Sequence, residues 1–182
     1  RIWNVARTDS LILDSMNQDI SSTDLVAYYK MSNGTGTVLT DDSANGHTAN
    51  LIDSPTWFSG LPWDRSLQLN GSSQYATCGG PSDFYFTNQL TVEAWIYPTD
   101  FKTQMHMNTI VAKTYWNPTS YGWTLRYGSS SGTLCFNLAG EGTSWIDCIA
   151  DNALTLNTWQ HVAATYNGSY IALYVNGVYM KN

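Results

Sequence analysis

A short polar loop near residue 40 concentrates oxygen-bearing groups of the kind that bind hard cations. Asp41 and Asp42 are followed closely by Asn45 and Gly46. Calcium takes its ligands from carboxylates, amides and main-chain carbonyls, and these four residues offer all three. The same residues also suit an ordinary Asx-type turn. We therefore expect either a calcium site at Asp41, Asp42, Asn45 and Gly46 or a plain turn.

Aromatic side chains are a second group that could do chemistry, because flat rings stack on the C–H faces of sugars. They make up 14% of the chain, with eight Trp and twelve Tyr. A large β-structure buries most of its aromatics, so only those expected in loops or at loop edges are candidates. These candidate ligand-binding residues are Trp57, Trp63, Trp116 and Trp145.

The three cysteines are Cys78, Cys135 and Cys148. An odd number argues against a complete disulfide framework. Cys135 and Cys148 flank an expected turn around Gly140 and Gly142, so they could face each other across a hairpin. We expect either a Cys135–Cys148 disulfide or two reduced thiols in the core.

Composition excludes several classes of function. The net charge is −6, only 12% of residues are charged, and the chain has no basic run, which argues against nucleic-acid binding. No apolar run approaches the ~20 residues of a membrane-spanning helix. The 182 residues suit one domain with its own core, rich in β-structure and turns.

The clearest strand pattern runs from Leu90 to Pro98. Apolar residues alternate there with Thr, Glu and aromatic residues until Pro98 ends the run. One face of this strand belongs in a core. The other face carries the lone acid Glu93 and two aromatic residues, and is either packed against another layer or an aromatic binding face.

The rest of the chain alternates between short strands and turns. A Thr8–Ser10 cap precedes the only convincing helix, which runs to about Met16. Asn167-Gly168 gives the strongest hairpin signal. Further strands are expected at 25–31, 66–69, 74–78, 109–114, 121–127, 133–138, 144–150, 159–166 and 170–176, with 66–69 and 74–78 paired as a hairpin. This spacing predicts an all-β, antiparallel two-sheet jelly-roll sandwich with one short N-terminal helix.

Several motifs resemble laminin G-like domains of the concanavalin A-like lectin and glucanase superfamily. They are Thr-Val-Glu-Ala-Trp-Ile at 91–96, Asp-Ser-Ala-Asn-Gly at 42–46, Ser-Leu-Gln-Leu-Asn-Gly at 66–71, Thr-Trp-Gln-His-Val-Ala at 158–163 and Tyr-Val-Asn-Gly at 174–177. The resemblance covers residues 25 to about 178. Ala44 stands where the family usually has Gly. Such domains often carry calcium at loops on the rim of the sandwich, which the resemblance extends to the 41–46 loop.

The first segment resembles the family's last strand and closing helix, displaced to the N-terminus. Arg-Ile-Trp-Asn-Val-Ala-Arg at 1–7 carries this likeness. We therefore expect residues 1–24 to be the tail of a preceding repeat or a donated strand, and residues 25–182 to be a sandwich lacking its last strand. The chain would be a fragment of a tandem array, a permuted domain, or a subunit that donates Ile2, Trp3 and Val5 as an assembly strand to its neighbour's open sheet edge.

The resemblance makes hydrolase activity improbable on the residues present. Related glucanases carry Glu-x-Asp-x-x-Glu on one strand, and glycoside hydrolysis needs two carboxylates. Here Glu93 has no second acid on its strand, and Glu141 lies in a Gly-rich turn. We expect a non-catalytic, secreted or cell-surface adhesion module that binds glycan or extracellular protein, with calcium as a possible cofactor. The alternative is a structural subunit of an extracellular array or filament, self-assembled head-to-tail.

Overall fold

The computed structural model describes the chain from Arg1 to Asn182 except residues 61–62, 87, 104–107, 117–119 and 130. Its elements are β1 (Ile2–Trp3), α1 (Asp9–Ser15), β2 (Leu25–Ala27), β3 (Val38–Leu39), β4 (Ala49–Ile52), β5 (Thr56–Gly60), β6 (Trp63–Gln68), β7 (Tyr75–Thr77), the 3₁₀ turn η1 (Ser82–Phe84), β8 (Leu90–Ile96), β9 (Asn108–Trp116), β10 (Ser120–Gly128), β11 (Thr133–Ala139), β12 (Ile146–Ala150), β13 (Gln160–Tyr166), β14 (Ile171–Val175) and β15 (Val178–Lys181). None of the helices in this described part has the length and apolar character that a membrane crossing needs.

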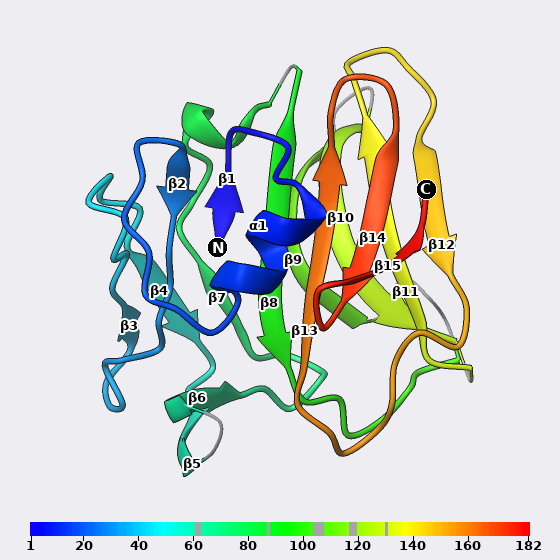
Figure 1. Cartoon of the computed structure of the whole chain (residues 1–182). Coiled ribbons are helices and arrows are strands. Elements are labelled where there is room, and N and C mark those ends of the chain that lie inside the picture. The colour runs from blue at the N-terminus through cyan, green and yellow to red at the C-terminus, as the bar shows by residue number, and fades with distance from the viewer. Residues whose placement is uncertain (61–62, 87, 104–107, 117–119, 130) are drawn as a thin grey trace. The chain divides into compact units, whose positions relative to one another are not determined.

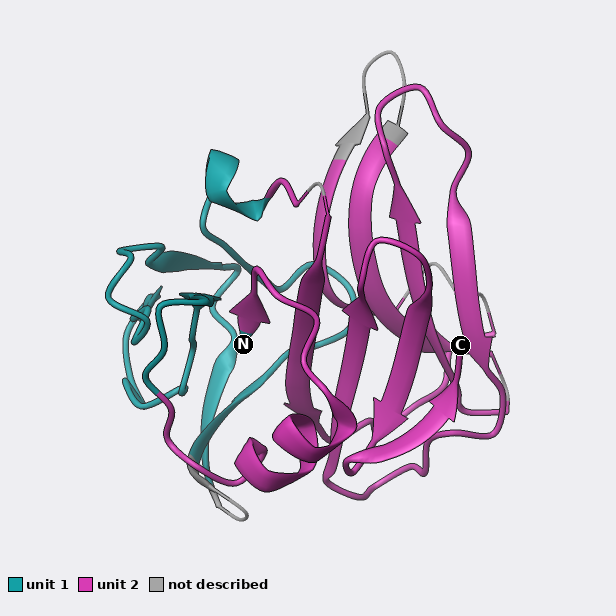
Figure 2. Ribbon diagram, turned by 45° about the horizontal axis from the view of Figure 1, so that its top comes forward, with its two compact units in different colours: residues 1, 21–84 teal, residues 2–20, 85–182 magenta. Residues whose placement is uncertain are grey.

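The chain divides into two compact units, coloured separately in Figure 2. Unit 1 holds residue 1 and residues 21–84, and unit 2 holds residues 2–20 and 85–182. The sequence-based boundary at residue 24 concerns repeats rather than compact units, and it stays a prediction.

Unit 2 is built from two antiparallel sheets. The β8 sheet contains β15, β14, β13, β8 and β1 in that order, and the β10 sheet contains β12, β11, β10 and β9. The expected hairpins β11–β12 and β13–β14 are both present. Strand β14 lies against β11 and β12, so the two sheets face each other (Figure 1). The predicted all-β jelly-roll sandwich is thereby confirmed.

Alternation along β8 divides its side chains between two environments. Leu90 and Val92 are fully buried and point to the same face as Leu173 of β14, the face turned toward the β10 sheet. Leu125 and Phe136 of the β10 sheet are equally buried. Burying side chains of this size stabilises the fold by roughly 1.5–3 kcal/mol each relative to exposure.

The other face of the β8 sheet is covered by α1, which crosses it in Figure 1. Thr8 caps the helix as expected, its hydroxyl accepting from the Leu11 N–H. Ile12 is fully buried in a cluster with Ala163 and Tyr174 of the sheet. This answers the question that the sequence left open, since the second face of β8 is packed against another layer.

The N-terminal strand is paired within its own chain. Ile2 lies opposite Val92 and Trp3 opposite Thr91 in β8, and Val5 accepts a hydrogen bond from the Thr91 hydroxyl at 2.7 Å. The chain thus closes its own sheet edge in this structure. Exchange of the same strand between molecules concerns more than one chain and stays a prediction.

Unit 1 contains the three-stranded sheet β3-β4-β7 and the hairpin β5–β6. The expected pairing of 66–69 with 74–78 is wrong. Strand β6 pairs with β5, and β7 pairs with β4 instead. The Asn70 turn therefore connects two different sheets. Leu39, Ala49 and Leu51 form the core of this unit.

The expected disulfide is also wrong for this structure, in which all three cysteines are free thiols. Cys135 lies opposite Ile149, whereas Cys148 lies opposite Phe136. Because neighbouring positions of a strand point to opposite faces, the two thiols lie on opposite sides of the sheet and cannot be joined. Burial raises the pKa of both thiols, which keeps them protonated.

Candidate functional site

Glu93, the one acid of the central strand, lies inside a closed polar cluster on the face that α1 covers. Its side chain is almost fully buried. The Trp3 indole N–H donates to Glu93 Oε1 at 3.1 Å, and His161 Nε2 lies 3.4 Å from Glu93 Oε2. The cluster forms because β1 and β13 both pair with β8, which brings Trp3 and His161 to the two sides of Glu93.

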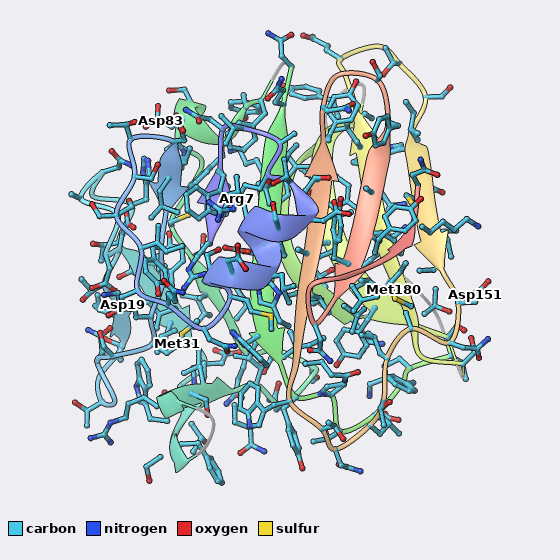
Figure 3. All side chains as sticks on the ribbon, viewed as in Figure 1. Arg7, Asp19, Met31, Asp83, Asp151 and Met180 are labelled. Atoms are coloured by element: carbon cyan, nitrogen blue, oxygen red, sulfur yellow. The ribbon has the colours of Figure 1, made fainter. Side chains whose placement is uncertain are left out.

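The N-terminal segment (residues 2–16) covers this cluster on the face of the β8 sheet that carries α1. The Arg7 guanidinium lies 4.0 Å from the centre of the Trp3 ring, and Figure 3 labels Arg7 beside α1. The Trp95 indole N–H donates to the Met16 carbonyl at 2.9 Å. The Tyr174 hydroxyl donates to Asp9 at 2.8 Å, and burial together with this carboxylate raises the pKa of Tyr174 to about 12.

This geometry gives Glu93 a structural role. Glycoside hydrolysis needs a carboxylic acid within reach of a glycosidic oxygen and a second carboxylate across the bond. Glu93 is sealed under the N-terminal segment, and its oxygens face an indole and an imidazole. A buried charge without such partners would be costly, so the cluster explains why an acid is tolerated here.

The Asp41 loop uses its first carboxylate to fix its own backbone. Asp41 Oδ1 accepts from the N–H groups of Tyr28 and Ser43, and Oδ2 accepts from the Ser43 hydroxyl and the His47 N–H, all within 2.8–3.0 Å. Burial alone would raise the pKa of Asp41, but these four donors outweigh it and lower the pKa below its ordinary value.

Those four bonds occupy the acceptor positions of the Asp41 carboxylate, so Asp41 does not fit as a calcium ligand in this geometry. The Asn45 amide N–H₂ donates to the carbonyls of Leu25 and Val26, which adds to the scaffold. Calcium therefore stays a prediction, for which Asp42, the Asn45 side-chain oxygen and the Gly46 carbonyl would have to supply the oxygens.

The four candidate tryptophans do not form one site among the described residues. Trp57 of β5 is half-buried against the core of unit 1, and its indole N–H donates to the Gly36 carbonyl at 2.9 Å. Trp145 is half-buried just before β12 in unit 2. Trp63 and Trp116 belong to β6 and β9, and their side chains lie outside the described part of the structure.

A different surface of unit 1 combines exposed aromatic and polar groups. Thr56 pairs with Gln68 and Phe58 with Ser66, so these four side chains share one side of the β5–β6 hairpin. We call this side the hairpin face. Phe58 is 55% exposed. A small cavity of about 280 Å³ lies at the Thr56–Gln68 end of the hairpin, lined by Thr56, Gln68, Leu69, Asn70 and Gln74.

Sequence reasoning missed this face because residues 53–66 carry no extended alternation and read as an irregular stretch. The signal that could have found it is Thr-Trp-Phe-Ser-Gly at 56–60, a short aromatic run of strand-forming residues next to a turn. Trp57, the residue chosen from this run, points to the buried side of the same strand.

Comparisons with known proteins agree with the geometry of the sandwich. The laminin G-like family model of the concanavalin A-like lectin/glucanases superfamily matches residues 70–182. A similar solved structure is domain 4 of AbnA, a GH43 extracellular arabinanase from Geobacillus stearothermophilus, in complex with arabinotriose. It has a TM-score of 0.59 and 17% sequence identity, over 86% of this chain and 73% of that chain. Among curated proteins, no match to the chain is found.

Proposed function

Because the chain belongs to the concanavalin A-like lectin/glucanases superfamily, we propose that it is a non-catalytic, secreted or cell-surface module that binds glycan. The observation that carries the proposal is the contrast around Glu93. The single acid of the central strand is sealed by Trp3, His161 and the N-terminal segment, while aromatic and polar groups are exposed on the hairpin face. A domain of similar fold whose structure is known in complex with arabinotriose supports a glycan as the ligand.

A glycan array followed by calorimetric titration of the best hit tests this proposal. The full chain should bind a defined subset of the glycans on the array. It should release no reducing sugar from them over a long incubation. Parallel arms with calcium and with a chelator test the predicted cation dependence. Retention of no glycan would contradict the proposal, as would release of sugar that Glu93→Gln abolishes.

A second candidate function is assembly through the N-terminal segment, and one observation favours it. The bonds that hold this segment run to distant parts of the sequence, from Trp3 to Glu93, Met16 to Trp95 and Asp9 to Tyr174. The same bonds could form with another copy, because each of them joins groups that are far apart in the sequence. Exchange between chains is a known low-cost route to oligomers.

Mixing two differently tagged preparations at high concentration tests assembly. Exchange through this segment predicts mixed oligomers by native mass spectrometry, and none with Trp3→Ala. Only monomers at every concentration would contradict it. Adhesion through a protein partner is the remaining outcome if neither glycans nor copies of the chain bind.

A further inference from the structure

Two side-chain amides hold the turn next to the hairpin face in a fixed conformation. Asn70 Oδ1 accepts hydrogen bonds from the backbone N–H groups of residues 72–74. Gln74 accepts from the Asn70 N–H at 2.9 Å and donates to the carbonyls of Asp53 and Ser54, both at 3.0 Å. These bonds fix the turn after β6 and hold one side of the cavity in place before any ligand arrives.

Two other polar side chains that line the cavity make no such hydrogen bonds to the backbone among the described residues. Thr56 and Gln68 are exposed and directly paired across the hairpin, and neither side chain has a hydrogen-bond partner among the described residues. Directly paired positions have Cβ atoms about 4.5–5.5 Å apart, so the hydroxyl and the amide can reach one ligand group together. Both groups donate and accept, as a sugar hydroxyl does.

Apolar surface adjoins this polar pair. Phe58 lies two residues from Thr56 on the same side of β5, which places it about 7 Å away along the strand. Leu69, 46% exposed, lines the cavity directly after β6. One sugar ring can therefore set its C–H face on Phe58 while its hydroxyls reach Thr56 and Gln68.

The uncharged lining of the cavity and the negative net charge of the chain favour neutral over acidic glycans. Every side chain that lines the cavity is uncharged. The chain as a whole carries a net charge of −6, which disfavours uronate and sulfate groups. The cavity of about 280 Å³ is also smaller than a typical pocket for a drug-sized ligand, so it suits one sugar residue.

We propose that the hairpin face is a subsite for a single neutral sugar residue, which stacks on Phe58 while two of its adjacent hydroxyls hydrogen-bond to the Thr56 hydroxyl and the Gln68 amide. This inference rests on the proposed glycan-binding function and adds its location and chemistry. Most of this surface precedes residue 70, where the match to the family model begins, so the subsite belongs to this chain's own hairpin.

Calorimetric titration of the full chain with two neutral trisaccharides, arabinotriose and xylotriose, and with trigalacturonate tests the subsite. At least one neutral trisaccharide should bind and trigalacturonate should bind more weakly. Phe58→Ala should raise Kd about tenfold, which corresponds to about 1.4 kcal/mol. Gln68→Ala should raise it several-fold, and Phe58→Tyr should keep it near the wild-type value.

Tyr170→Ala is the matched control, because Tyr170 is similarly exposed, at 52% against 55% for Phe58, and lies in unit 2. It should bind as the wild type does. NMR chemical-shift changes in the unmodified chain provide a second readout that needs no variant, and they should centre on Thr56, Phe58 and Gln68.

The outcomes separate the two proposals. If the wild type binds a neutral trisaccharide and Phe58→Ala binds it equally well, the subsite lies elsewhere and only the present inference fails. Tighter binding of trigalacturonate would likewise overturn the neutral-sugar assignment alone. If the wild type binds no glycan in the array or in the titrations, the proposed function fails as well.

Discussion

The covered face of the β8 sheet and the hairpin face both combine aromatic and polar side chains, but these are buried on the first and exposed on the second. On the covered face, the polar groups of Trp3, Glu93 and His161 are turned toward one another under α1. On the hairpin face, Thr56 and Gln68 keep their polar groups free beside an exposed ring. Residue type alone therefore does not identify a site. What distinguishes the two regions is whether the polar side chains are buried against one another or exposed to solvent.

The largest effect is expected from opening the covered face. Trp3→Ala removes a side chain that is 1% exposed and leaves Glu93 without its indole donor. We expect a loss of about 3–5 kcal/mol in the free energy of unfolding, measured by urea denaturation. Leu11→Ala, on the exposed side of α1, is the control and should change stability by about 0.5 kcal/mol. Equal losses for both variants would show that α1 does not seal this face.

A smaller effect is expected from neutralising Glu93 without changing its shape. Glu93→Gln weakens the bond from Trp3 and the contact with His161, and should cost about 2–3 kcal/mol in the free energy of unfolding. Glycan affinity, measured on the folded variant, should stay unchanged because Glu93 is remote from solvent. A large loss of glycan affinity in a correctly folded variant would instead place the glycan site on the covered face, and the hairpin face would not be the site.

The Asp41 loop is a second region of unit 1 in which a polar side chain is already bonded within the chain. The native state lowers the pKa of Asp41 below its ordinary value of 3.8. The carboxylate therefore contributes stability above that pH, and the contribution is lost as the pH falls through the lowered native-state pKa. Asp41→Asn should cost about 2 kcal/mol at neutral pH and flatten the acid limb of the stability profile. The profile is measured by thermal melts between pH 2 and 7. A profile that the substitution leaves unchanged would show that these hydrogen bonds do not hold Asp41, which would then be available as a calcium ligand.

The smallest effect is expected at Ala44 in the same loop. Its φ of 72° lies in the left-handed region, where a Cβ is unfavourable and where the resembling domains have Gly. Ala44→Gly should stabilise the chain by about 0.5–1 kcal/mol, because the relieved strain exceeds the entropy that Gly adds to the unfolded state. Ala76→Gly in β7 is the control and should destabilise it. Stabilisation by both changes would contradict a local origin in the backbone.

The sequence determined the local parts of this protein. Alternation along Leu90–Ile96, the Asn167-Gly168 turn and the Thr8 cap each act between near neighbours, and β8, the β13–β14 hairpin and α1 all form where these signals lie. The resemblance of the later motifs was enough to indicate the family.

The tertiary structure alone decided the contacts between distant residues. Pairing of β7 with β4 rather than β6, and the opposite faces of Cys135 and Cys148, depend on register, which a short pattern does not set. The fate of Glu93 depends on Trp3, 90 positions earlier in the chain. The fold brings Trp3 and His161 to Glu93 and leaves Thr56 and Gln68 without a hydrogen-bond partner in the part of the chain that the structure describes. It is therefore packing that separates the scaffold from the candidate site.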